Sequence, residues 1–272
     1  MRRGWIAAGA AAAAVVPVTW AWFEAGWVRL RSLELAVPQL DDALTGLRIL
    51  HLSDLHLGMP SRGERAVRCA FDWAASIDPD FIVVTGDLVS RPRGDAGLRR
   101  LLQGIDVPTY AVLGNHDVEN SRDPFSRTAG LRDLSPARLL VDEADTIELR
   151  GRSVQIVGVD PRSFGQGLSR PETLADPAAD LRILLCHFPR VLDSLAAGAF
   201  QLVLAGHMHD GQISVPYLRG KLRLAHLGAP YTTGVYERAR TVMHVSPGLG
   251  TTFVPFRFFA RPEATELLLQ PA

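Results

Sequence analysis

The most constraining feature of this 272-residue chain is a set of short apolar runs, most of which end on residues able to bind a metal ion. Short apolar runs bounded by glycine and polar residues are typical of β-strands buried on both faces. Ligands bind beyond the carboxyl ends of such strands in α/β sheets. The sequence therefore predicts a chemical site at one sheet edge, built from SDLH at 53–56, GD at 86–87, GNHD at 114–117, His187 and GHMH at 206–209.

Strands and helices alternate through the first half of the soluble part. Strands are predicted at 48–53, 81–85 and 108–113, with helices at about 63–77 and 95–104 between them, which is the order of a largely parallel sheet. A second set of strands is predicted near 146–149, 153–159, 182–186, 202–205, 222–227 and 241–245. We therefore expect an α/β protein, a four-layer αββα sandwich in which two mixed sheets pack face to face with helices outside.

The N-terminal segment is apolar enough to cross a membrane. Residues 4–23 carry no charged side chain, and about 20 apolar residues span a bilayer core as a helix. Trp20, Trp22 and Trp27 lie where aromatic rings favour the membrane interface. We expect residues 1–30 to form a transmembrane anchor, with a cleaved export signal as the alternative. The basic residues do not settle the orientation, although the α-amino group slightly favours a domain outside the cytoplasm.

A connector with a first strand is expected over 31–45, followed by one catalytic domain over 46–272, which is long enough to bury a large core. Lys plus Arg and Asp plus Glu both number 29, so the chain lacks the basic surplus of nucleic-acid-binding proteins. Cys69 and Cys186 form no CxxC pair, and we interpret both as buried apolar residues. The oligomeric state is left open.

The polar clusters combine carboxylates, an amide and imidazoles without a thiolate, which suits Mn, Fe or Zn better than Mg alone. Asp54 and His56 are two residues apart on an extended strand end, so both project to one side. His207 and His209 have the same spacing. Asp87 could give one carboxylate oxygen to each of two ions and hold them about 3.5–4 Å apart, the spacing used in two-metal phosphoryl transfer.

The order of DLH, GD, GNHD, His187 and GHMH resembles the calcineurin-like metallophosphoesterase superfamily, and the resemblance covers residues 46–260. Within the superfamily the chain is similar to a membrane-anchored bacterial branch, through GLRILHLSDLHLG at 46–58, HVSPGLG at 244–250 and PFRFFARPE at 255–263. That branch includes exported or anchored phosphoesterases and a UDP-2,3-diacylglucosamine hydrolase of lipid A biosynthesis.

The resemblance implies two divalent metal ions, with Mn expected and Fe or Zn as alternatives. His116 would be the catalytic residue that stabilises or protonates the leaving oxygen. A hydroxide bridging the ions would attack phosphorus in line. Two ligand sets are implied: Asp54, His56, Asp87 and His209 for one ion, and Asp87, Asn115, His187 and His207 for the other.

Two departures from the family pattern lie near the GD motif. Protein phosphatases of the superfamily carry an aspartate three residues after the bridging one, where this chain has Ser90. We therefore expect Asp117 or a backbone carbonyl to orient His116. Arg91 comes next, and it either binds phosphate bidentately as a substrate-binding residue or is a solvated loop arginine.

A further departure follows the last histidines, where close bacterial relatives read GHTHGGQ and this chain reads GHMHDGQ at 206–212. Asp210 either orients His209 or caps a turn. Structural roles are expected for His51, His226 and His244, each placed in a strand.

Two longer stretches are ambiguous. Residues 212–236 form either an apolar wall for an acyl chain or, as we favour, a pair of core strands. The loop at 119–134, with its three arginines, either caps the site or is a solvated helix face.

The expected function is metal-dependent hydrolysis of a phosphoester or pyrophosphate bond in a phosphorylated small-molecule or lipid-linked substrate. UDP-2,3-diacylglucosamine is the leading candidate, because an anchored enzyme meets such a lipid in the plane of the membrane. The alternatives are an exported general phosphomonoesterase or phosphodiesterase and a catalytically dead interaction scaffold. The lipid A precursor is made on the cytoplasmic side, which conflicts with the charge argument for a domain outside.

Overall fold

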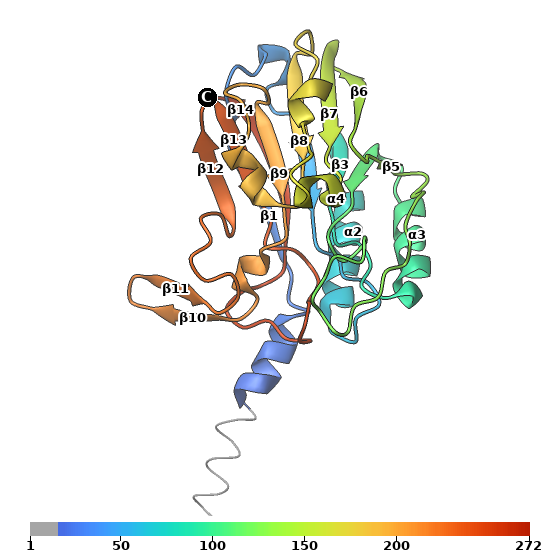
Figure 1. Ribbon diagram of the computed structural model, residues 1–272, viewed down its shortest axis with the longest axis vertical. Helices are drawn as coiled ribbons and strands as arrows, with labels where there is room; N and C mark the ends of the chain where they lie inside the picture. The colour runs from blue at the N-terminus through green and yellow to red at the C-terminus, as the bar shows by residue number, and fades with distance from the viewer. Residues whose placement is uncertain (1–15) are drawn as a thin grey trace, which may run out of the picture.

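Residues 16–272, which a computed structural model describes, form two six-stranded mixed sheets and a separate two-stranded hairpin (Figure 1). In the first sheet β2, β3, β4 and β5 run parallel, while β14 is antiparallel to β2 and parallel to β1. Its strands in spatial order are β1 (Arg29–Val37), β14 (Glu263–Pro271), β2 (Arg48–Leu52), β3 (Phe81–Thr85), β4 (Thr109–Val112) and β5 (Arg138–Leu139).

The second sheet has four parallel central strands and an antiparallel strand at each edge. The central strands are buried on both faces, which is why they read as apolar runs in the sequence. The α/β class with two mixed sheets is therefore confirmed. The strands in spatial order are β12 (Gly234–Arg238), β13 (Thr241–Val245), β9 (Leu202–Ala205), β8 (Leu181–Leu185), β7 (Arg152–Gly158) and β6 (Glu143–Leu149).

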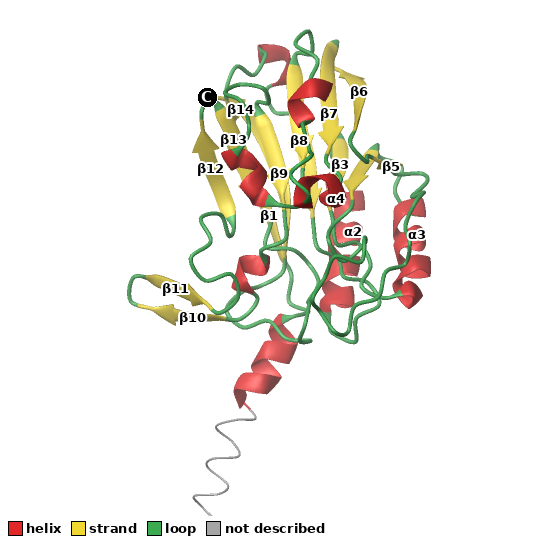
Figure 2. Ribbon diagram, in the orientation of Figure 1, coloured by secondary structure: helices red, strands yellow, loops and turns green. Residues whose placement is uncertain are grey.

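Three apolar layers hold the sheets and helices together. Side chains such as Ile49, Val83, Ile183 and Leu204 fill the space between the sheets. Helices α2 (Gly63–Ile77) and α3 (Asp95–Gln103) cover the outer face of the first sheet (Figure 2). Within the described residues, the outer face of the second sheet is covered by short elements: α4 (Pro161–Gly165) and the 3-10 helices η3 (Pro171–Leu174) and η4 (Pro189–Asp193). The fourth layer is thus thinner than predicted.

The predicted strand at 222–227 is wrong in place and extent. Strand β10 (Ser214–Tyr217) pairs with β11 (Gly220–Arg223) as a hairpin outside both sheets, and the chain then turns. Strand β14 was not predicted. It pairs with β1 and β2, which are distant in sequence, and no local pattern specifies those partners. Short 3-10 helices complete the elements: η1 (Asp42–Leu44), η2 (Pro92–Gly94) and η5 (His209–Gly211).

Residues 16–24 form a helix that docks on the closing segment of the chain. The Glu24 carboxylate accepts hydrogen bonds from the backbone N–H groups of Phe259 (3.0 Å) and Ala260 (2.7 Å). Most of the predicted transmembrane segment falls on residues 1–15, which lie outside the described residues. Among residues 16–272, no helix combines the length and the apolar character needed to cross a bilayer.

Candidate metal centre

The strand register brings the polar clusters to one edge of the two sheets. Leu52 lies opposite Val84, and Val84 opposite Ala111, so the loops after β2, β3 and β4 leave the first sheet side by side. In the second sheet Leu185 lies opposite Leu204, which aligns the loops after β8 and β9. The structure brings together all of the predicted ligands and the predicted catalytic histidine: Asp54, His56, Asp87, Asn115, His116, His187, His207 and His209.

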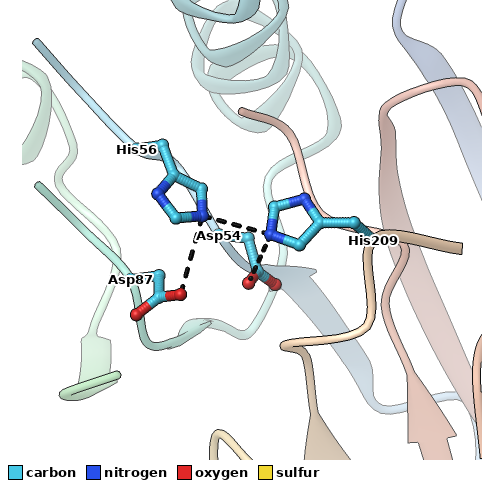
Figure 3. A group of neighbouring side chains, drawn as sticks. All are labelled: Asp54, His56, Asp87 and His209. Atoms are coloured by element: carbon cyan, nitrogen blue, oxygen red, sulfur yellow. Dashed lines mark hydrogen bonds and ion pairs between the residues drawn. The ribbon is translucent and has the colours of Figure 1, made fainter. Parts of the chain in front are cut away.

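One group of four side chains is buried and convergent (Figure 3). One ligand atom from each of Asp54, His56, Asp87 and His209 lies within 4.8 Å of the others. The Nε2 atoms of His56 and His209 are 3.1 Å apart, and His209 Nε2 is 3.3 Å from Asp54 Oδ1. Two imidazole nitrogens facing two carboxylates are a donor set that fits a divalent cation with mixed N and O ligands.

A second group shares Asp87 with the first. His187 Nε2 lies 3.3 Å from Asp87 Oδ2, 3.1 Å from Asn115 Oδ1 and 3.1 Å from His207 Nδ1. The Oδ2 atom also faces His56 at 3.6 Å, whereas Oδ1 accepts the backbone N–H of His116 at 2.8 Å. Both groups of histidines therefore face Oδ2, while Oδ1 accepts a backbone hydrogen bond, and the sharing of the two oxygens between two ions stays a prediction.

Backbone strain is concentrated at these loops. Five of the predicted ligands have left-handed backbone conformations, which cost about 1–3 kcal/mol each for residues other than glycine. Such strain persists only where the surrounding structure enforces it, and it is typical of functional sites. Gly114 is required for the same packing, because a side chain there would collide with Asp87. The strained residues are Asp54 (φ 51°), His56 (46°), Asp87 (51°), His207 (72°) and His209 (50°).

The histidine rings are held by contacts behind the site. His187 Nδ1 donates to the Thr85 carbonyl (2.9 Å), which leaves Nε2 free to bind an ion. His56 Nδ1 lies 2.6 Å from Ser90 Oγ. His209 Nδ1 instead accepts a hydrogen bond from Nη2 of Arg257 (3.1 Å), an arginine with no exposed surface. Arg257 was not predicted to belong to the site, and its one signal in the sequence is its place in the closing segment PFRFFARPE.

The charges of the site balance one another inside the protein. Burial by itself raises the pKa of Asp54, but His209 and His187 outweigh it and the pKa is lowered. Burial lowers the pKa of His187, but Asp87 outweighs this and raises the pKa to about 9. The charges of His187 and His116 likewise outweigh burial at Asp87 and lower its pKa. The two aspartates are thus held ionised in a buried site, where they favour cations.

His116 sits beneath a loop that returns over the site. Its Nδ1 is 2.9 Å from Ser126 Oγ, and its Nε2 is 3.0 Å from Ser121 Oγ and 3.3 Å from Thr252 Oγ1. Its Nε2 also lies 3.9 Å from Asp87 Oδ2, so the ring faces both ligand groups. The loop at 119–134 forms no helix and covers His116 through serines, not through its arginines.

The predicted orienting partners of His116 are wrong. Ser126, which holds Nδ1, donates a hydrogen bond from its hydroxyl to the carbonyl of Ser90 (3.3 Å). The carboxylate of Asp117 is used elsewhere, because it accepts the backbone N–H groups of Leu88, Val89 and Gly114. Burial and the charge of Asp87 raise the pKa of Asp117 to about 7. Asp117 therefore joins the GD and GNHD loops to each other.

Arg91 and Asp210 hold neighbouring segments in place. Arg91 donates from Nε to the Phe125 carbonyl (2.8 Å), a contact that favours a structural role in the covering loop. Asp210 forms ion pairs with Lys221 (2.9 Å) and Arg223 (2.7 Å) of β11. Both predictions for Asp210 are wrong, since it neither orients His209 nor caps a turn but ties the hairpin to the ligand loop.

An apolar cavity of about 290 Å³ lies beside the centre, against His209. Its wall includes Ile213, Leu224 and Val254. His226 also lines it, with its ring centroid 5.2 Å from that of His207. The prediction that His226 lies in a strand is wrong, because it occupies an exposed turn after β11.

Comparisons with known proteins agree with this geometry. Residues 47–211 match the family model of the calcineurin-like phosphoesterases. The uncharacterized metallophosphoesterase YkuE of Bacillus subtilis is 30% identical over 83% of this chain and 79% of its own length. A bovine transmembrane protein with a metallophosphoesterase domain is 30% identical over 89% of this chain, which spans 57% of the bovine protein. The UDP-2,3-diacylglucosamine pyrophosphatase LpxG of Chlamydia muridarum is 25% identical over 90% of this chain and 91% of its own length.

The two mixed sheets and the buried Asp/His cluster at their shared edge define a metal-dependent hydrolase of phosphoester bonds. The chain belongs to the calcineurin-like phosphoesterase family, whose members use two metal ions, as the order of its motifs predicted.

Proposed function

We propose that this protein hydrolyses the phosphoester or pyrophosphate bond of a lipid-linked substrate, with UDP-2,3-diacylglucosamine as the specific candidate. The observation that carries the hydrolytic step is the pair of ligand groups that share Asp87 beside His116. The observation that favours a lipid is the apolar cavity against His209. The distant relative LpxG is named as a pyrophosphatase of this lipid.

Each predicted metal ligand has a role in this proposal. Asp54, His56 and His209 hold one ion, Asn115, His187 and His207 hold the other, and Asp87 is shared. Mn is the proposed metal, with Fe and Zn as alternatives. When bound, the ions neutralise phosphoryl charge and supply the nucleophilic hydroxide.

His116 is the proposed general acid. Its Nε2 faces Asp87 and its Nδ1 is fixed by Ser126. An imidazole held in this way can donate a proton to the leaving oxygen. Ser121 and Thr252, which also contact Nε2, would have to yield that position to the substrate.

The proposal extends to the membrane. An enzyme acting on the lipid A precursor needs its catalytic domain on the cytoplasmic face, and the apolar, uncharged residues 4–15 support an inner-membrane anchor. The same activity on an exported domain would require another substrate.

The test uses full-length protein purified in detergent with Mn. We expect release of UMP and lipid phosphate from UDP-2,3-diacylglucosamine, and a loss in kcat of about 10²–10⁴-fold for His116→Gln with unchanged metal content. Loss of metal from His116→Gln would contradict its role as the acid. Turnover of bis(p-nitrophenyl) phosphate without turnover of the lipid would indicate a general phosphoesterase. Full metal content without turnover of either would indicate a scaffold.

A further inference from the structure

The hairpin of β10 and β11 exposes large apolar side chains to solvent. Within the described part of the chain, the two strands pair only with each other, and they project from the end of the molecule that carries the N-terminal helix (Figure 1). Leu218 at the tip is fully exposed, and Tyr217 is 61% exposed. The expectation that residues 212–236 form core strands is therefore wrong for the hairpin. Exposed apolar patches of this kind mark binding surfaces.

A second exposed apolar cluster lies on and just after the helix at 16–24. The ring of Phe23 is 5.8 Å from that of Trp20 and 5.7 Å from that of Trp27, and each of the three side chains is at least 40% exposed. Arg261 stacks on Trp27 at 3.7 Å. Tryptophan rings beside an arginine are typical of the headgroup region of a bilayer.

One residue joins the two surfaces. The backbone N–H of Phe259 donates to Glu24 at the end of the helix, and the Phe259 carbonyl accepts from Lys221 of the hairpin. Phe259 is itself 42% exposed. The helix and the hairpin are thus fixed on neighbouring sides of the same closing segment, and their apolar side chains can meet one surface together.

The charge of the hairpin indicates what that surface is. Residues 210–229 contain three basic side chains, Arg219, Lys221 and Arg223, and one acidic one, Asp210, which pairs with Lys221 and Arg223; three positive charges less one negative charge leave a net charge of +2. An apolar tip flanked by basic residues is complementary to anionic lipid headgroups over an acyl interior. The sequence before the helix is also apolar and uncharged from residue 4 to residue 15, a composition that favours a lipid environment.

We propose that the β10–β11 hairpin and the aromatic cluster of Trp20, Phe23 and Trp27 dock together on an anionic lipid bilayer, with Leu218 inserted below the headgroups. The cavity beside His209 begins where β11 ends, since Leu224 lines it. The Asp210 ion pairs with Lys221 and Arg223 hold the hairpin against the loop of His209. If the proposed function holds, the cavity then receives its lipid directly from the bilayer.

The direct test places an environment-sensitive NBD label on the hairpin. Leu218→Cys and Asp106→Cys are prepared in a Cys69→Ala background, because Cys186 is buried and Cys69 is not. Asp106 precedes β4, so it lies at the end of the first sheet opposite to the loops that carry the metal ligands. The full chains are reconstituted into vesicles of phosphatidylcholine and phosphatidylglycerol that contain doxyl-labelled lipid.

We expect a blue-shifted emission and strong quenching for the label at 218, and neither for the label at 106. A label at 218 that is quenched no more than the one at 106 would overturn the proposal. A blue shift at 218 without quenching by lipid would also overturn it, because the hairpin would then face protein.

A second measurement separates docking from the proposed substrate. Leu218→Asp should lower turnover of a vesicle-embedded lipid substrate severalfold and leave turnover of bis(p-nitrophenyl) phosphate unchanged. Leu168→Asp, at a leucine that is 64% exposed on the loop between α4 and η3, should change neither. If the wild-type protein turns over no lipid, the proposed function fails, and the quenching result still decides the docking.

Discussion

The guanidinium of Arg257 is the most unusual single group near the metal centre. It is fully buried and donates to three backbone carbonyls, those of Gly250, Pro247 and Ala260, as well as to His209. Burial lowers the pKa of Arg257 to about 10, which leaves it charged at neutral pH. The arginine thus fixes the ring of His209 with Nε2 directed at Asp54.

Replacement of Arg257 by lysine should weaken the metal centre. An ammonium group cannot reach His209 and three carbonyls at once. We expect Arg257→Lys to lower Mn affinity by about 10–100-fold, as for other residues that orient metal ligands. Calorimetric titration of the full-length protein measures this, with Arg100→Lys on the surface of α3 as the matched control. Unchanged Mn affinity in Arg257→Lys would show that His209 is held without it.

At the scale of elements, the loop at 119–127 and the segment at 251–254 form a cover over His116. Asp123 joins the two, since its Oδ2 accepts from Thr252 Oγ1 (3.0 Å) and from the Phe253 N–H (2.8 Å). Its Oδ1 accepts the N–H of Phe125 (2.8 Å). The Asp123 carboxylate therefore links the two segments of the cover.

Asp123→Ala should open this cover without changing the sheets. Hydrogen bonds to a charged group contribute about 1.5–3 kcal/mol each, so we expect amide hydrogen exchange at Phe125 and Phe253 to accelerate by at least about tenfold. Exchange in α2 should not change. Asp133→Ala, which removes a local contact with Ser135 in the same loop, is the control. Equal exchange in the two variants would mean that Asp123 does not hold the cover.

At the scale of the whole molecule, two histidines join the sheets beneath the metal centre. His51 of β2 and His244 of β13 meet with their Nδ1 atoms 2.8 Å apart, and His51 Nε2 lies 2.9 Å from Thr85 Oγ1. Burial lowers the pKa of both, that of His244 to about 3. Both rings are neutral in the folded protein, where one N–H donates to the other ring.

This pair should make folding sensitive to acid. Below the ordinary histidine pKa of 6.5 the unfolded chain binds a proton at His244 that the folded protein excludes. Stability is therefore present above pH 6.5 and is lost as the pH falls toward 3, by at most about 1.4 kcal/mol per pH unit for one group. Between pH 6.5 and 4.5, the free energy of unfolding should fall by about 2–3 kcal/mol less in His244→Gln than in the wild type. Chemical denaturation at each pH measures this, and parallel curves would contradict it.

The buried parallel strands and the residues at their carboxyl ends could be predicted from the sequence. Apolar runs buried on both faces have a strong local pattern, and parallel pairing then places Asp54, Asp87 and His187 at one edge. Asp54 and His56 lie together as predicted, but the predicted extended backbone is wrong, since both residues adopt left-handed conformations. Local chemistry was sufficient because each ligand follows its own strand directly.

Only the tertiary structure decided what holds and covers those ligands. Arg257 reaches His209 from 48 residues away, and Thr252 reaches His116 from 136 residues away. No local period specifies such contacts, because they depend on how the closing segment packs across both sheets. The hairpin could not be predicted for the same reason. The apolar sequence around Leu218 is equally consistent with a side chain packed in a core and with a fully exposed one. Whether such a side chain is buried depends on contacts with residues distant in sequence, which only the folded structure shows.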